Sequence, residues 1–202
     1  MLLECVKIMQ DRYIDPERGF LALQQWVAIR LPPLLPHEGV AGYPYGVTVT
    51  LSMDKCLKKT FDLTLLQEDP WDWWGDTAQS LRLATYIPYR HRKDTLTELL
   101  LPRLNRNASI TDIFYDPHCG TGRTFLAAHA TGWPGIYCGV ETNPKAYRLC
   151  LLNIATHNLP AYVIQKPTPP QMDHPNWEKY NTYNNINFSF LNEVLQKKTI
   201  KE

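Results

Sequence analysis

The sequence predicts an α/β fold built on a parallel sheet. Strand-like apolar runs at residues 110–116, 135–141 and 161–165 alternate with helix-like patterns at 121–131 and 144–157. A βαβαβ series of this kind forms a parallel sheet with right-handed crossovers. The 202 residues are 44% hydrophobic and 20% charged, an ordinary globular composition that excludes a disordered or collagen-like chain. We therefore expect one domain with an appended element.

The residues before this series predict a helix and two strands. Apolar residues at helical spacing predict a helix over 18–31, which Pro32 ends because proline has no N–H to donate. Alternating apolar and hydroxyl residues predict strands at 46–52 and 61–65, paired as a hairpin or within a small sheet. We expect an N-terminal helix plus β-hairpin extension.

The chain is thus expected to have three parts. Residues 1–83 form the N-terminal extension with its helix and small β element, and residues 84–165 form the α/β core, which opens with a helix at 94–104. Residues 166–202 are a segment rich in Pro and Asn, with a short amphipathic helix at 189–198.

Charge is nearly balanced overall but uneven along the chain. The net charge of +1 excludes a protein coated in basic residues for nucleic-acid binding. Residues 60–81 carry a net charge of −5 and residues 82–106 a net charge of +4. Both runs fit a solvated surface, and the basic strip at 82–106 also fits a phosphate-contacting surface.

Targeting signals and cysteine patterns indicate a cytoplasmic protein. No run of about 18 apolar residues predicts a membrane span, and Glu4 stands where a signal peptide would need basic residues. The five cysteines form no CxxC pair, so neither a disulfide framework nor a zinc site is expected. Reduced, mostly buried thiols are the expectation.

The segment around residues 114–125 predicts a ligand-binding turn. A strand ends at Asp116, and a turn containing Gly120 and Gly122 leads into a helix. Such a turn lets the backbone approach a ligand closely and presents the N–H groups of a helix N-terminus. Glu141, at the end of the next strand, is suited to accept hydrogen bonds from vicinal ribose hydroxyls.

The residues around the turn favour S-adenosylmethionine over a dinucleotide. A dinucleotide fingerprint needs a third small residue where Phe125 stands, and Asp116 would repel a pyrophosphate. A carboxylate there suits the ammonium group at the amino-acid end of S-adenosylmethionine. A strand–turn–helix corner that binds no ligand remains the alternative.

Three segments resemble the adenine-N6 DNA methyltransferases. Residues 116–122, Asp-Pro-His-Cys-Gly-Thr-Gly, resemble the D-P-x-C-G-[ST]-G motif I of that family. Residues 139–146 with Leu152, Asn153 and His157 are similar to its motif II and the helix that follows. Residues 86–88, Tyr-Ile-Pro, are similar to motif X, and all three occur in the family's order across residues 84–165. The resemblance implies a truncated Rossmann-like methyltransferase sheet.

The resemblance also implies roles for individual residues. Motif X would flank the methionine moiety, motif I would cradle the amino-acid end and ribose, and Glu141 would bind the ribose hydroxyls. Cys119 is expected to be a small buried side chain rather than a nucleophile, and His118 is expected to face solvent. The implied cofactor-binding set is Tyr86, Ile87, Pro88, Asp116, Pro117, Gly120, Gly122, Glu141, Thr142 and Asn143, with Thr142 or Asn143 beside the adenine.

The sequence departs from the family at the catalytic motif. Adenine-N6 enzymes carry [DNS]-P-P-[YFW], whose polar groups accept hydrogen bonds from the target amine and whose aromatic ring stacks on the flipped base. The nearest string here, residues 167–171, lacks both the polar first residue and the aromatic. Catalytic residues therefore stay unassigned.

Three explanations of this departure stay open. In the first, the chain is a fragment or half of a split enzyme completed by a partner subunit. In the second, it binds the cofactor without methyl transfer. In the third, catalytic groups come from the tryptophan-rich acidic loop at 68–76, whose rings would stack on a base or bind a partner. The structural alternative for this loop is an anchor packed on the core. We expect an S-adenosylmethionine-dependent methyltransferase domain similar to DNA adenine-N6 enzymes, contacting DNA through the strip 82–106, or alternatively a non-catalytic binding or scaffolding protein.

Overall fold

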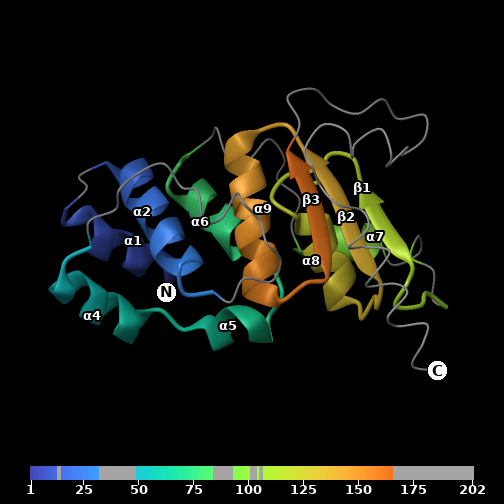
Figure 1. Cartoon of the computed structure of the whole chain (residues 1–202), viewed down its shortest axis with the longest axis horizontal. Coiled ribbons are helices and arrows are strands. Elements are labelled where there is room, and N and C mark those ends of the chain that lie inside the picture. The colour runs from blue at the N-terminus through green and yellow to red at the C-terminus, as the bar shows by residue number, and fades with distance from the viewer. Residues whose placement is uncertain (13–14, 32–48, 84–92, 101–103, 105–106, 166–202) are drawn as a thin grey trace.

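The computed structural model describes residues 1–12, 15–31, 49–83, 93–100, 104 and 107–165. A group of helices lies at one end of the molecule and a sheet at the other, with α9 standing between them (Figure 1). The elements, in chain order, are α1 (Leu2–Gln10), α2 (Pro16–Ala28), α4 (Leu51–Thr60), α5 (Leu63–Glu68), α6 (Trp73–Ser80), α7 (Lys93–Leu100), β1 (Ile113–Asp116), α8 (Arg123–Ala130), β2 (Ile136–Glu141), α9 (Pro144–His157) and β3 (Ala161–Gln165).

The predicted parallel sheet is confirmed. Its strand order is β1-β2-β3, and both neighbouring pairs run parallel. Asp116 at the end of β1 is in register with Gly139 of β2, so β2 continues two residues further to Glu141. The predicted helices at 121–131 and 144–157 correspond to α8 and α9. This is a small open α/β sheet.

The helix α9 begins and ends on local signals in the sequence. Asn143 caps its N-terminus, because its Oδ1 accepts a hydrogen bond of 2.8 Å from Lys145 N, and Pro144 follows at the first helical position. The helix ends at Asn158, whose φ of +52° is left-handed.

The predicted β-hairpin is wrong. Residues 46–48 lie outside the described part of the chain, Val49 and Thr50 are not in a strand, and α4 begins at Leu51. The run at 61–65 enters α5 rather than forming a strand. Two of the polar side chains that made these runs look alternating are helix caps: Thr50 Oγ1 accepts from Met53 N at 3.2 Å, and Asp62 Oδ1 accepts from Thr64 N at 2.9 Å. The described part of the extension is therefore helical.

Two of the other predicted helices are confirmed. The helix predicted at 18–31 corresponds to α2, and the one predicted at 94–104 corresponds to α7. The helix predicted at 189–198 lies outside the described residues.

Helix α9 belongs to two hydrophobic clusters. Leu149 and Leu152 pack in a cluster with buried residues of α1, α2, α4 and α6. Cys150 and Ile154 of the same helix pack with Tyr137 and other residues of the sheet and α8. The helical group and the sheet are therefore joined through one shared helix.

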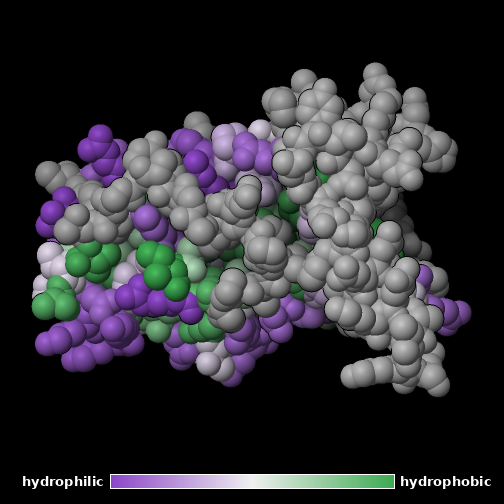
Figure 2. Space-filling view, in the orientation of Figure 1, coloured by the Kyte–Doolittle hydropathy of each residue, from purple (hydrophilic) through white to green (hydrophobic). Residues whose placement is uncertain are grey.

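The surface over the helical group is mixed. Hydrophilic residues gather along the outer edge formed by α4, where Lys55, Lys58 and Lys59 are exposed (Figure 2). Within the described ranges, no helix has the length and apolar character needed to cross a membrane.

Candidate ligand-binding site

The turn after β1 has the backbone that only glycine adopts readily. Gly120 has a φ of +56° and Gly122 a φ of +86°, and other residues would be strained there. Gly122 is also the N-cap of α8, so the turn leads directly into a helix N-terminus. The turn thus joins a strand end, bare backbone and the N-terminus of a helix.

Glu141 presents one carboxylate oxygen toward this bare backbone. Its Oε1 accepts hydrogen bonds from the backbone N–H groups of Thr142, at 2.7 Å, and Asn143, at 2.6 Å. Its Oε2 would lie 4.0 Å from a Cβ atom placed on Gly120. No residue in the described part of the chain donates a hydrogen bond to Oε2, so this oxygen is available to accept one.

Asp116 holds the turn closed. Its Oδ1 accepts from His118 N at 2.9 Å and its Oδ2 accepts from Thr124 Oγ1 at 2.6 Å. Each carboxylate oxygen has a second lone pair, so these bonds leave capacity for a ligand. Asp116 therefore braces the turn as well as placing a negative charge at the end of β1.

The remaining predicted residues of the turn fall where the sequence indicates. His118 is exposed and Pro117 is partly buried, while Cys119 is 4% exposed. Burial raises the pKa of the Cys119 thiol well above its usual value, with the neighbouring Cys150 acting in the same direction. A buried, protonated thiol is not a nucleophile, which agrees with the expected packing role.

The residues predicted beside the adenine are only partly described. Asn143 Oδ1 caps α9, while Thr142 is partly buried next to Glu141. Tyr86, Ile87 and Pro88 lie outside the described residues.

The tryptophan-rich acidic loop packs on the core, which agrees with its interpretation as an anchoring loop. Trp71 is 4% exposed and Trp74 is 0% exposed, so neither ring has a free face for a base. Trp74 Nε1 donates to Thr156 Oγ1 at 3.2 Å, and the Trp71 carbonyl lies 3.0 Å from His157 Nε2. Both contacts tie the loop to α9.

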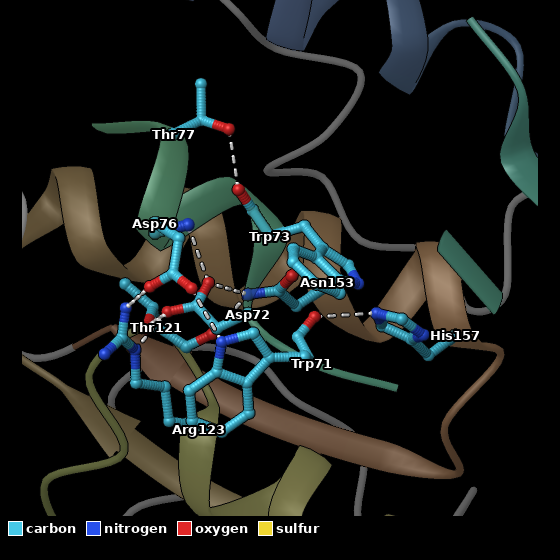
Figure 3. A network of polar contacts seen from close by, with 10 residues as sticks. Trp71, Asp72, Trp73, Asp76, Thr77, Thr121, Arg123, Asn153 and His157 are labelled. Atoms are coloured by element: carbon cyan, nitrogen blue, oxygen red, sulfur yellow. Dashed lines mark hydrogen bonds and ion pairs between the residues drawn. The ribbon is translucent and has the colours of Figure 1, made fainter. Parts of the chain in front are cut away.

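Asp72 connects this loop to the turn, a link that the sequence reasoning missed. Its side chain is fully buried and accepts four hydrogen bonds (Figure 3). Oδ1 accepts from Gly75 N at 2.7 Å and from Asn153 Nδ2 at 2.6 Å. Oδ2 accepts from Arg123 Nε at 2.7 Å and from Thr121 Oγ1. Asp72 therefore meets the turn, the start of α8 and the middle of α9.

Arg123 bridges two carboxylates, that of Asp72, the N-cap of α6, and that of Asp76 within α6. Besides Asp72, its guanidinium pairs with Asp76 and lies 5.3 Å from the centroid of the Trp71 ring. Burial raises the pKa of Asp72, and the charge of Arg123, with hydrogen bonds from Thr121, Arg123 and Asn153, opposes that shift. All four donors on Asp72 match a carboxylate that only accepts, so the network fits its ionised form.

Comparison of the chain with models of known protein families, with curated proteins and with solved structures finds no match in any of the three. The case for a function therefore depends on the residues themselves.

Proposed function

We propose that the turn binds S-adenosylmethionine and that the chain is a cofactor-binding methyltransferase domain similar to DNA adenine-N6 enzymes. The observation that carries the proposal is the placement of Glu141 Oε2 opposite the bare backbone of Gly120, at the carboxyl ends of two neighbouring parallel strands. Ligands of open α/β sheets bind at this edge.

Each part of the turn matches one part of the cofactor. A carboxylate oxygen with free capacity suits the two ribose hydroxyls, as the resemblance implies for Glu141. The negative charge of Asp116 and the partial positive charge of the α8 N-terminus suit a zwitterionic amino-acid group. The same negative charge disfavours a pyrophosphate, which makes a dinucleotide the poorer candidate.

Methyl transfer in such a domain depends on positioning. The target amine attacks the methyl group in line, and the protein supplies orientation and electrostatic stabilisation. The adenine amine of DNA is the proposed acceptor, with the strip 82–106 contacting phosphates.

The second candidate is a binding or scaffolding protein that retains the cofactor turn. Two observations favour it: the chain has no N-P-P-aromatic tetrapeptide, and two of the three tryptophans of the acidic loop, Trp71 and Trp74, are buried.

Calorimetry with S-adenosylmethionine and with its demethylated product tests the cofactor assignment. Glu141→Gln keeps an oxygen for the backbone N–H groups but removes the second acceptor, so we expect affinity to fall about tenfold or more. Glu68→Gln, at an exposed position of α5, is the matched control and should bind like the unmodified protein. Equal affinity of both variants, or no binding by the unmodified protein, would refute the assignment.

A methyl-transfer assay with labelled cofactor separates the two candidates. Transfer to DNA supports the methyltransferase, and transfer to adenine N6 is the product expected. Cofactor binding without transfer to DNA, RNA or protein supports the scaffold.

A further inference from the structure

Thr121 is held on two sides by residues far from it in the sequence. Its hydroxyl donates to Asp72 Oδ2, and its carbonyl accepts from Asn153 Nδ2 at 2.8 Å (Figure 3). Asn153 Nδ2 also donates to Asp72 Oδ1 at 2.6 Å, which closes a ring of three residues. Thr121 lies between Gly120 and Gly122, so these hydrogen bonds fix the middle of the turn.

Capping of α6 does not explain the ring. An N-cap carboxylate needs one oxygen for the helix N–H, and Asp72 Oδ1 meets that need through Gly75 N. The second oxygen is directed at Thr121 and Arg123, on the turn and the first residue of α8. Burying a carboxylate completely is costly unless it is paired and hydrogen-bonded, and here Thr121 of the turn and Arg123 of α8 supply two of the four donors.

The backbone conformation that this ring of hydrogen bonds stabilises, with positive φ at two glycines, is one that the chain would otherwise seldom adopt. Two glycines with positive φ lose more conformational freedom on ordering than any other residues. Because the folded protein already orders the turn, the binding of a ligand does not carry the entropy cost of ordering it.

We propose that Asp72 is a positioning residue that fixes the turn in its binding conformation through Thr121 and thereby sets the affinity for the ligand of the turn. The identity of that ligand rests on the proposed function, whereas the effect on the turn does not. The helical group, through the loop before α6, thus controls a site built on the sheet.

Four single substitutions test the proposal. Thr121→Val removes the hydroxyl at constant shape, and Thr121→Ser restores it. Thr77→Val is the matched control, because Thr77 is also buried and donates at 2.7 Å to the Trp73 carbonyl within α6, away from the turn. Asn153→Ala removes the donor to both the Thr121 carbonyl and Asp72 Oδ1. It gives a second route should Thr121→Val fail to fold, and we expect it also to speed exchange of the turn.

Two measurements are made on each protein. Hydrogen–deuterium exchange of a peptide spanning residues 117–125 reports on the turn without ligand, and calorimetry with the demethylated cofactor reports on binding. We expect Thr121→Val to speed exchange and to weaken binding by about tenfold, the order expected for one hydrogen bond to a charged group. Thr121→Ser and Thr77→Val should behave like the unmodified protein.

The outcomes separate this inference from the proposed function. Unchanged exchange in Thr121→Val, an equal change in Thr77→Val or no rescue by Thr121→Ser would overturn it, as would unchanged affinity when the unmodified protein binds. If the unmodified protein does not bind, the cofactor assignment fails. The exchange data then decide alone: faster exchange confined to Thr121→Val supports the role of Asp72 in holding the turn, and unchanged exchange refutes it.

Discussion

Replacing Gly75 by alanine should destabilise the protein, although the same change inside a helix ordinarily stabilises it. Gly75 lies in α6, where alanine is favoured over glycine by about 1 kcal/mol. A Cβ atom at this position would overlap Asp72 Oδ2 and lie 2.6 Å from its Cγ. The carboxylate cannot move aside without leaving the Thr121, Arg123 and Asn153 donors.

The expected loss follows from these contacts. Breaking a buried, hydrogen-bonded charge pair costs about 3–5 kcal/mol. Subtracting the gain in helix propensity of about 1 kcal/mol leaves a net destabilisation of roughly 2–4 kcal/mol. At about 2–4 °C per kcal/mol for a chain of this size, the Tm should fall by roughly 5–15 °C.

Urea denaturation at pH 7 measures the change, with Gly19→Ala in α2 as the matched control. A Cβ on Gly19 would lie 3.0 Å from Cγ of the Gln10 side chain, which needs to move by only a few tenths of an ångström. We therefore expect the free energy of unfolding of Gly19→Ala to differ from that of the unmodified protein by less than about 1 kcal/mol. In an Asp72→Ser background the obstacle is smaller, and Gly75→Ala should lose most of its penalty. A higher Tm for Gly75→Ala, or an equal penalty in both backgrounds, would refute the clash.

Three further predictions follow from burial, charge and packing. Iodoacetamide at pH 8 should modify Cys56 well before the four buried cysteines, as read by mass spectrometry, and comparable labelling of a buried thiol in the native protein would contradict the structure. Hydrogen bonding by Lys58 lowers the pKa of Asp54, so its stabilisation is present above about pH 4, near the unfolded value, and is lost as pH falls through the lower native pKa. Asp54→Asn should therefore weaken the dependence of the unfolding free energy on pH between about 2 and 4. The same pH dependence in Asp54→Asn and in the unmodified protein would contradict the pairing of Asp54 with Lys58. Residues 84–165 produced without residues 1–83 should show no cooperative thermal unfolding by circular dichroism, because α9 would expose Leu149 and Leu152; a cooperative transition would show that the core stands alone.

The sheet could be predicted from the sequence because its signals are local. Each strand is a short apolar run, and each helix between them starts at a recognisable boundary, Gly122 for α8 and Asn143 followed by Pro144 for α9. The glycine turn and Glu141 were found for the same reason, since both follow directly from strand ends.

The hairpin was mispredicted because a cap and an outward-facing strand residue look alike. Thr50 and Asp62 are short polar residues beside apolar ones, which fits either interpretation. Burial of Met53 and Leu57, four residues apart, is the helical signal that distinguishes α4, and the alternating pattern before it hid that spacing.

The Asp72 network had no local signal at all. Asp72 is 49 residues from Thr121 and 81 from Asn153, and no spacing rule connects them. The cluster of acids and tryptophans marked the loop as unusual, and two interpretations were open. Only the fold, which packs α6 against α9, shows that the Trp71 and Trp74 rings are buried and anchor the loop.

The position of α9 explains why the helical group and the turn should behave as one unit. A helix that is apolar on opposite faces has to be covered on both. The sheet and α8 cover the face with Cys150 and Ile154, whereas α1, α2, α4 and α6 contribute to the cluster over Leu149 and Leu152. Asn153, on the same helix, carries the polar link from Asp72 to the Thr121 carbonyl. A variant that displaces Asp72, such as Gly75→Ala, should therefore lower stability and loosen the turn together. A variant of α6 that leaves the contacts of Asp72 in place, such as Thr77→Val, should leave the turn unchanged.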